Sequence, residues 1–326
     1  MSTLRAADHP VPSPATGAAP TRAVLLMAYG SPRTKDEILP YYTHMRGGRA
    51  PRPAALAELE SRYAAIGGIS PLTEITTAQA AALANLLRRE EGPEWTVQVG
   101  MKHIQPFIED AVAELVAERV TDAVGIVLAP HYSSMSVAGY LERARAAAAG
   151  TGLRLHFVED WHLEPSYLDW LAVAISAKLA KLSPERAAST LVIFTAHSLP
   201  ARLRDLGDPY PDQLGETATA VAERLALPRW TVGWQSVAQD TGEPWLGPEL
   251  LRVVRDAAAE GTKDFIVCAC GFVADHLEVR FDLDVEAQQV AGELGVSIAR
   301  TAMPNDDPAF IRVLYGLALR GMAAPA

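Results

Sequence analysis

Two segments of the sequence carry side chains that could handle a metal ion or protons. In the first, residues 192–200, an apolar and β-branched run stops at His197. In the second, residues 271–286, an apolar run leads into a stretch with carboxylates at positions i, i+4 and i+8, namely Glu278, Asp282 and Glu286. This spacing places the carboxylates on one face of a helix, where like charges repel. A bound cation or a proton-transfer function would explain their presence.

His197 suits such chemistry because an imidazole titrates near neutral pH and can accept a proton or bind a divalent transition metal. A neighbouring carboxylate would help to hold its cationic form. Nitrogen and carboxylate ligands together suit Fe(II), Co(II) or Zn(II). Two other interpretations stay open: His197 could be a structural residue whose hydrogen bonds are satisfied, and the three carboxylates could form a solvent-exposed acidic helix face. The isolated histidines favour structural roles in loops: His44, His103, His131 and His276.

The bulk composition limits the classes of function. The chain has 326 residues, enough for one large or two smaller domains, with an ordinary globular content of 49% hydrophobic residues. A net charge of −10 argues against a nucleic-acid partner, since phosphate binding needs a basic face. No apolar run approaches the roughly 18 residues of a membrane span. Residues 1–20 lack the apolar core of a secretory signal, so we expect a flexible tail there and a cytoplasmic protein.

The only two cysteines, Cys268 and Cys270, alternate within one apolar run. Buried free thiols are favoured over metal ligation or a disulfide. Two cysteines cannot supply the four thiolates that an iron–sulfur cluster usually needs. The sequence therefore predicts no such cluster.

Short apolar runs alternate with amphipathic helical stretches, which is the pattern of βαβ units on a parallel sheet. Two sets of four strands are predicted: 23–28, 96–101, 125–129 and 153–158, then 191–195, 231–234, 264–269 and 296–301. The sets resemble each other, since Tyr29-Gly30-Ser31-Pro32 follows the first strand of one and His197-Ser198-Leu199-Pro200 the first strand of the other. A helix is also expected at 35–45 and a C-terminal helix at 308–319.

We therefore predict an α/β fold of two similar doubly wound, Rossmann-like halves, each with a four-stranded parallel sheet flanked by helices. Residues 21–160 would form the N-terminal half, and residues 161–326 the C-terminal half with His197, Glu278 and the C-terminal helix. Ligands of such sheets bind beyond the carboxyl ends of the strands. The active-site cleft should accordingly lie between the halves.

The long insertion after the first strand, residues 32–95, adds basic, aromatic and apolar side chains to this cleft. Arginines lie there with tyrosines, and the planar guanidinium suits carboxylates, although surface charge is the alternative. A Gly-rich segment at 66–72 lacks phosphate-binding spacing and is interpreted as an apolar lip. With Tyr29 on one wall and His197 with carboxylates on the other, the cleft fits a flat apolar ligand with acidic tails and a metal-accepting centre.

At these residues the chain resembles the ferrochelatase family, from about residue 24 to about residue 319. Four motifs carry the resemblance: residues 195–200 followed by Gly207-Asp208-Pro209-Tyr210, residues 233–236, residues 245–248, and residues 271–278. Segments 26–32 and 41–46 are most similar to the bacterial coproporphyrin III ferrochelatases. The implied reaction inserts Fe(II) into coproporphyrin III, gives Fe-coproporphyrin III and releases two protons in haem biosynthesis.

The resemblance also implies residue roles. His197 and Glu278 would be the catalytic pair on the iron side, and Tyr29 would meet the metal axially from the opposite face. Asp282 and Glu286 match an outer acidic row that passes metal or protons outward. The positions that match porphyrin contacts are Tyr29, Arg46, Arg62, Tyr63, Ser70 and Tyr140. Gly47 departs from the pattern, because close relatives often have a basic residue there, and this affects the expected propionate contacts.

Fe(II) would be a substrate rather than a permanently bound cofactor, and a coproheme decarboxylase would be the transient partner that takes the product. Alternatives are a protoporphyrin IX ferrochelatase, a cobalt or sirohydrochlorin chelatase of the same fold, and a non-catalytic haem or coprohaem carrier. The acidic row of Glu278, Asp282 and Glu286 favours an enzyme, since a carrier needs no route for metal.

Overall fold

The computed structural model describes residues 21–238 and 242–323, so the tail expected at residues 1–20 lies outside the described residues. All eight predicted strands are present, with ends shifted by up to about three residues, as expected when boundaries are read from a pattern. In the first half they are β1 (Arg22–Ala28), β2 (Trp95–Met101), β3 (Asp122–Val127) and β4 (Arg154–Val158). In the second half they are β5 (Leu191–His197), β6 (Trp230–Gln235), β7 (Asp264–Cys268) and β8 (Ser297–Arg300).

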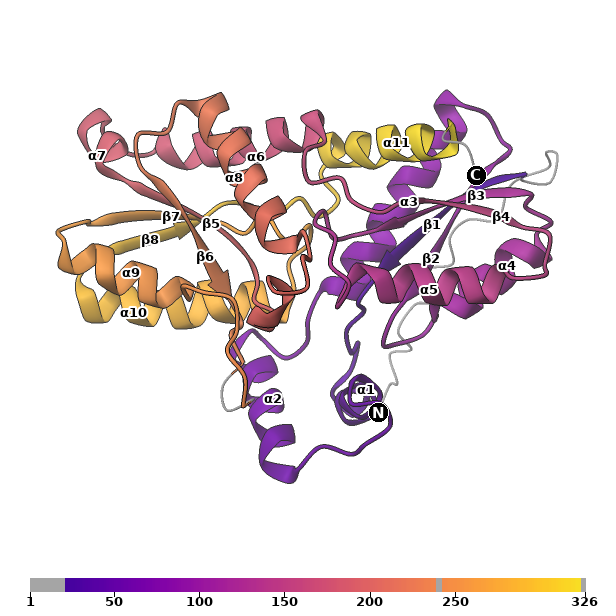
Figure 1. The fold of residues 1–326 in the computed structure, drawn as a ribbon, viewed down its shortest axis with the longest axis horizontal. Coiled ribbons are helices and arrows are strands. Elements are labelled where there is room, and N and C mark those ends of the chain that lie inside the picture. The colour runs from indigo at the N-terminus through magenta and orange to yellow at the C-terminus, as the bar shows by residue number, and fades with distance from the viewer. Residues whose placement is uncertain (1–20, 239–241, 324–326) are drawn as a thin grey trace, which may run out of the picture.

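The strands form two separate parallel sheets with the same internal order, β2-β1-β3-β4 and β6-β5-β7-β8. Figure 1 shows the two sheets side by side, each covered by helices. The predicted pair of similar, doubly wound halves is thus confirmed. β1 and β5 occupy equivalent central positions, and both are almost entirely buried because helices cover both faces.

Helices around the first sheet include α3 (Leu72–Glu90), α4 (Ile108–Ala117) and α5 (Val137–Ala148). The predicted helix at 35–45 comprises a 3₁₀ turn, Lys35–Glu37, and α1 (Ile38–Met45). Together with α2 (Pro53–Ala65), α1 projects below the sheets in Figure 1. These two helices of the insertion therefore stand apart from the sheets, whereas α3 packs on β2.

Helices of the second half are α6 (Pro165–Leu179), α7 (Pro184–Ser189), α8 (Tyr210–Leu225), α9 (Leu250–Ala259) and α10 (Ala287–Leu294). The expected C-terminal helix is α11 (Pro308–Ala323), and it crosses back to pack on α3 and β3 of the first half. Among the described residues, no helix combines the length and apolarity needed to cross a bilayer.

One hydrophobic core runs through both halves and fixes them relative to each other. It contains buried side chains of each sheet, such as Leu26 and Phe194, together with Phe310 of α11. Tyr167 of α6 lies in this core and donates a hydrogen bond of 2.7 Å from its hydroxyl to the carbonyl of Cys270. Cys268 and Cys270 are free and buried, as predicted.

Gly271 permits the segment after β7 to lie directly on β5, one residue before His197. A Cβ at this position would lie 2.4 Å from the Cβ and 2.7 Å from the Cα of Ala196. Ala196 is held in place by its pairing with Trp234 of β6. We expect Gly271→Ala to lower the free energy of unfolding by about 1–3 kcal/mol, measured by urea denaturation. Gly316→Ala, where a Cβ meets nothing within 4 Å, is the control and should be neutral or slightly stabilising. Equal stability of the Gly271 variant and wild type would contradict this packing argument.

Candidate active site

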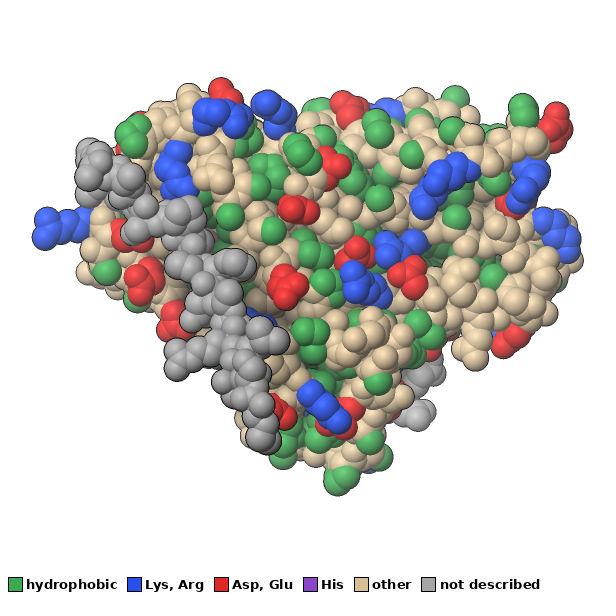
Figure 2. All heavy atoms as spheres, turned by 180° about the vertical axis from the view of Figure 1, so that it is seen from behind, with side chains coloured by type: hydrophobic (Ala, Val, Ile, Leu, Met, Phe, Trp, Pro, Cys, Tyr) green, Lys and Arg blue, Asp and Glu red, His purple; other side chains and the backbone are tan. Residues whose placement is uncertain are grey.

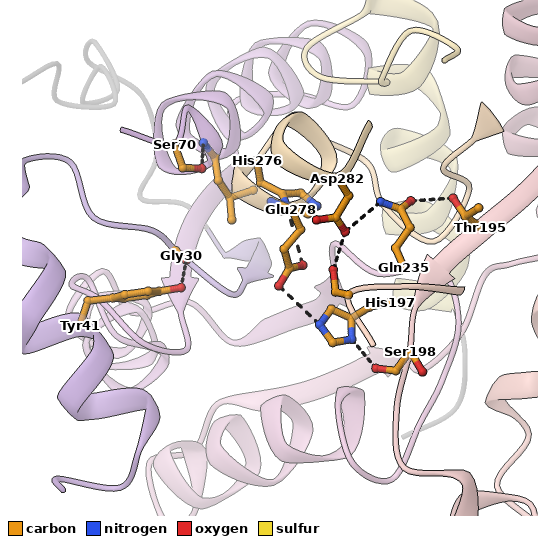
Figure 3. A network of polar contacts seen from close by, with 12 residues as sticks. Gly30, Tyr41, Ser70, Thr195, His197, Ser198, Gln235, His276, Glu278 and Asp282 are labelled. Carbon is orange, nitrogen blue, oxygen red and sulfur yellow. Dashed lines mark hydrogen bonds and ion pairs between the residues drawn. The ribbon is translucent and has the colours of Figure 1, made fainter. Parts of the chain in front are cut away.

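The centre of the site is a pair formed by His197 and Glu278. His197 is the last residue of β5, and its Nε2 lies 3.4 Å from Oε1 of Glu278 (Figure 3). Its Nδ1 contacts the carbonyl of Ser198, and the hydroxyl of Tyr210 donates a 2.9 Å hydrogen bond to the His197 carbonyl. Because both the backbone and the ring of His197 are hydrogen-bonded, the imidazole has one orientation. The structure thus brings these two predicted residues together.

The electrostatics of the pair favour two opposite charges. Burial alone would lower the pKa of His197, but the Glu278 carboxylate and the hydrogen bonds outweigh burial and raise this pKa to about 9. Burial alone would raise the pKa of Glu278, but His197 lowers it to about 2. At neutral pH His197 therefore carries a proton and Glu278 is ionised.

His276 joins this pair, although its sequence pattern favoured a structural role. Its Nδ1 lies 3.9 Å from Oε2 of Glu278 and accepts a 3.2 Å hydrogen bond from the Glu278 backbone N–H. Its Nε2 is buried and has no hydrogen-bond partner among the described residues. Burial lowers the pKa of His276, so its imidazole is neutral. The only sequence signal was its position two residues before Glu278.

Asp282 and Glu286 of the acidic row lie on a π-helix, Val279–Glu286, which Glu278 directly precedes, rather than on the α-helix that the spacing suggested. The π-helix bonds residue i to i+5, a rare arrangement that occurs often at functional sites. Asp282 lies between the other two carboxylates in the sequence, and the charges of Glu278 and Glu286 both raise its pKa. Its Oδ2 accepts hydrogen bonds from Ser236 at 2.8 Å and Gln235 at 3.4 Å, whereas Oδ1 is buried without a partner among the described residues. Burial and the Glu278 charge together bring the pKa of Asp282 to about 6.

Because the pKa of this carboxyl is raised toward neutral pH, Asp282→Asn should have a pH-dependent effect on stability. The raised pKa means that folding favours the protonated form, so the wild-type chain loses stability as pH rises from the ordinary value of 3.8 through about 6. A shift of about two units corresponds to roughly 2–3 kcal/mol as an upper bound. Asp282→Asn should therefore be more stable than wild type at pH 8, with the difference shrinking toward pH 4. Denaturant unfolding at both pH values checks this, and a pH-independent difference would contradict it.

The opposite wall carries Tyr29, just after β1, and Tyr63 of α2. Tyr29 is 40% exposed, and its ring centroid lies 4.5 Å from that of His103. Burial and then the charge of Glu278 raise the pKa of both tyrosine hydroxyls. Both hydroxyls therefore feel the charge of Glu278 and stay neutral.

The predicted arginines have different neighbours. The Arg62 guanidinium lies 4.6 Å from the ring centroid of Phe281 on the π-helix, and its charge lowers the pKa of Asp282 against the burial and carboxylate effects. Arg46 instead lies over the ring of Tyr42, 5.8 Å from its centroid, at the exposed end of α1. Arg62 thus belongs to the acidic row, and Arg46 remains free to meet a ligand from the outer side.

The remaining predicted contacts, Ser70 and Tyr140, are both buried. Ser70 accepts a 3.3 Å hydrogen bond from the backbone N–H of Leu72 at the start of α3. Tyr140 lies on α5 with the Lys102 ammonium 4.6 Å from its ring centroid. Beside the lip of residues 66–72 is an open pocket of about 270 Å³. It is lined by Lys35, Ile38, Glu60, Tyr63, Ala64, Gly67, Gly68 and Ile69.

Within residues 21–238 and 242–323, no three or more His, Cys, Asp or Glu side chains converge to hold a metal ion. The five residues predicted to meet metal therefore do not form one coordination shell. They form an ion pair with a line of carboxylates leading away from it, and a tyrosine opposite. This arrangement suits a cation and protons that pass through the site.

Comparison of the sequence with known proteins identifies a family. The ferrochelatase family model matches residues 21–322. The coproporphyrin III ferrochelatase of Oceanobacillus iheyensis is 44% identical over 299 residues, covering 91% of this chain and 96% of that protein. That of Halalkalibacterium halodurans is 46% identical over 294 residues, covering 89% and 94%.

The fold has a solved counterpart in a more distant protein. The cobalt complex of the sirohydrochlorin chelatase of Bacillus subtilis subspecies spizizenii has a TM-score of 0.57 at 11% identity, covering 94% of this chain and 97% of that one. That likeness concerns the two-half architecture alone. Taken with the family match over nearly the whole described chain, the sequence identity shows that this chain belongs to the ferrochelatase family.

Proposed function

We propose that this chain inserts Fe(II) into coproporphyrin III, producing Fe-coproporphyrin III and two protons in haem biosynthesis. The observation that carries the proposal is the His197–Glu278 ion pair facing Tyr29, in a chain 44% identical to a coproporphyrin III ferrochelatase over 91% of its length. In this proposal the flat macrocycle lies between the His197–Glu278 pair and the Tyr29 hydroxyl.

The pair has two tasks in this reaction. Only a neutral imidazole can bind a metal, so the proton on His197 must leave when Fe(II) arrives. Glu278 is already ionised and compensates part of the cation's charge. His197, once it has lost its proton, can then accept one from a pyrrole nitrogen as the metal enters the ring.

The acidic row gives these protons, or the incoming metal, a route. With a pKa of about 6, Asp282 exchanges protons readily near neutral pH. Glu286, whose pKa is raised by burial, continues the row at the end of the π-helix. Arg62 balances the negative charge of the row without neutralising it.

Arg46, Tyr63, Ser70 and Tyr140 are the proposed contacts to the porphyrin, with Arg46 the clearest candidate for a propionate because it is exposed. Gly47 offers no side chain there, and a Cβ at Gly47 would meet nothing within 4 Å. Fe(II) is a substrate in this proposal, with no resident cofactor and no iron–sulfur cluster. The product would pass to a coproheme decarboxylase in the cytoplasm.

Nucleic acid has no part in the proposal. On the face shown in Figure 2, acidic and basic side chains are intermixed rather than gathered into a broad basic patch. With the net charge of −10, this leaves that face without the positive surface that phosphates require.

The deciding experiment is anaerobic Fe(II) insertion followed by absorbance, with coproporphyrin III and protoporphyrin IX in parallel. Turnover of coproporphyrin III with little or none of protoporphyrin IX is expected. Preference for protoporphyrin IX would overturn the proposed substrate but leave the family assignment unchanged. Tight binding of both porphyrins without turnover would replace the enzyme by a carrier, and Co(II) insertion into sirohydrochlorin alone would identify a different chelatase.

A further inference from the structure

Helix α3 contacts both walls of the site. Near its N-terminus, the hydroxyl of Thr73 donates a 2.9 Å hydrogen bond to the carbonyl of Ser31 and accepts one of 3.0 Å from the Ser31 N–H. Ser31 lies two residues after Tyr29, so this contact ties α3 to the tyrosine wall. Thr73 and Ser31 are both buried.

Six residues further along the same helix, Gln79 contacts the opposite half of the molecule. Its side-chain nitrogen donates to the carbonyl of Asn305 at 2.8 Å and to that of Val273 at 3.2 Å. The side chain is completely buried. Because both partners are carbonyls, only the NH₂ group of the amide can face them, which fixes its orientation.

The Val273 carbonyl lies in the segment that leads from β7 to Glu278, and the Asn305 carbonyl lies in the loop between β8 and α11. The N–H of Asn305 donates to Val273, which joins the loops, and the Asn305 side chain exchanges two hydrogen bonds with Asp275 at 2.8 and 3.0 Å. Asp275 directly precedes His276, whose ring accepts the Glu278 N–H. Hydrogen bonds thus connect Gln79 through Asn305 to Asp275, and the backbone continues from there to His276, which bonds the Glu278 N–H.

We propose that Gln79 is a positioning residue for metal insertion: with Thr73, it makes α3 a spacer that fixes the distance between Tyr29 and Glu278. The two anchor points lie six residues apart on a rigid helix, about 9 Å along its axis. This inference rests on the proposed function, because the spacing matters only if a macrocycle lies between these side chains. Misplacement of a reacting group by about 1 Å can cost about 100-fold in rate.

The test is steady-state Fe(II) insertion into coproporphyrin III by Gln79→Met, which keeps the length and loses both donors. We expect kcat to fall at least about 10-fold, with the dissociation constant of coproporphyrin III, from fluorescence quenching, within about twofold of wild type. Hydrogen exchange followed by mass spectrometry should show faster exchange in residues 272–279. This second measurement needs no turnover, so it remains informative if the chain acts on another substrate.

Thr217→Val is the matched control. Thr217 is equally buried on α8 and joins the halves elsewhere, through His131 of the first half at 2.9 Å. It should leave kcat and exchange in residues 272–279 at wild-type values. If Thr217→Val lowers kcat as much as Gln79→Met, general loosening of the halves explains the effect and the proposal is wrong.

Thr73→Val provides the second variant, since it removes the hydrogen bonds at the other end of the spacer and conserves the shape. It should show the same fall in kcat without loss of porphyrin affinity, and it decides the question if Gln79→Met does not fold. Wild-type kcat in a folded Gln79→Met or Thr73→Val protein would overturn the proposal. So would a loss confined to porphyrin affinity.

Discussion

Replacing His197 with alanine should reduce Fe(II) insertion by about 10³-fold and leave the affinity for coproporphyrin III within about twofold of wild type. The imidazole lies at the end of β5 with Nε2 directed to Glu278, whereas Nδ1 of the neighbouring His276 is taken up by the Glu278 backbone N–H. Its loss removes the proposed nitrogen ligand and proton acceptor, while the proposed porphyrin contacts Arg46, Tyr63 and Tyr140 remain. Initial rates with saturating porphyrin, paired with fluorescence titration of the porphyrin, measure the two quantities separately.

His156→Ala is the matched control, because this histidine lies on β4, outside the site, and should leave turnover unchanged. A further check is Zn(II) in place of Fe(II), which excludes loss of activity through iron oxidation. If His197→Ala lost porphyrin binding but kept turnover of the bound fraction, His197 would be a porphyrin contact and its proposed role would be wrong.

The architecture was predictable from sequence for a physical reason. Central parallel strands are covered on both faces, so they appear as short continuous apolar runs, such as those of β1, β5 and β7. The chain leaves each strand at the same edge of its sheet, and this placed Tyr29 and His197 at ligand-binding edges. Their position depended only on local pattern and topology.

The details of the site were less predictable because tertiary contacts decide them. A spacing of four residues fits an α-helix, and only the packing of the segment revealed the π-helix under Asp282. Arg46 and Arg62 lie on the same insertion, yet α2 packs against the π-helix and brings Arg62 over Phe281, whereas Arg46 caps α1. Which tyrosine or arginine lies near Glu278 is a long-range property with no local signal.

Gln79 is a case in which the sequence does indicate a buried hydrogen bond. It lies on the buried face of α3 among Thr76, Ala80 and Leu83. A polar amide within an apolar stripe must find partners inside the protein, so its presence predicts a buried hydrogen bond. The identity of its partners, about 200 residues away, emerges only from the fold.

Glu278→Gln should lower kcat by about 100-fold and have a smaller effect on porphyrin affinity. Glutamine keeps the shape of the side chain and removes the charge that attracts Fe(II) and holds the proton on His197. Without that carboxylate, burial becomes the main influence on His197 and lowers its pKa, so the imidazole is neutral at pH 7. Between pH 6 and pH 9, the rate of the wild-type protein should depend on deprotonation of His197, whose pKa is about 9, and the rate of Glu278→Gln should not.

The same substitution has a signed effect on stability. The raised pKa of His197 contributes stability that is complete below its ordinary value of 6.5 and is lost as pH rises through about 9. The lowered pKa of Glu278 contributes stability above its ordinary value of 4.5, which is lost as pH falls through about 2. The pair therefore stabilises fully between pH 4.5 and 6.5. Both side chains are about one-third exposed, so we expect Glu278→Gln to lower the free energy of unfolding by about 1 kcal/mol at pH 6.

This difference should shrink above pH 9, where His197 is neutral in both proteins and wild type retains an unpaired carboxylate. Urea denaturation at pH 6 and at pH 9.5 distinguishes this from a steric effect of the substitution, which would be the same at both pH values. Full activity of Glu278→Gln combined with the expected stability change would make the pair a structural ion pair only. If Glu278→Gln instead loses activity at both pH 6 and pH 9.5 and shows the expected change in stability, the Glu278 carboxylate both attracts the metal and holds the proton on His197.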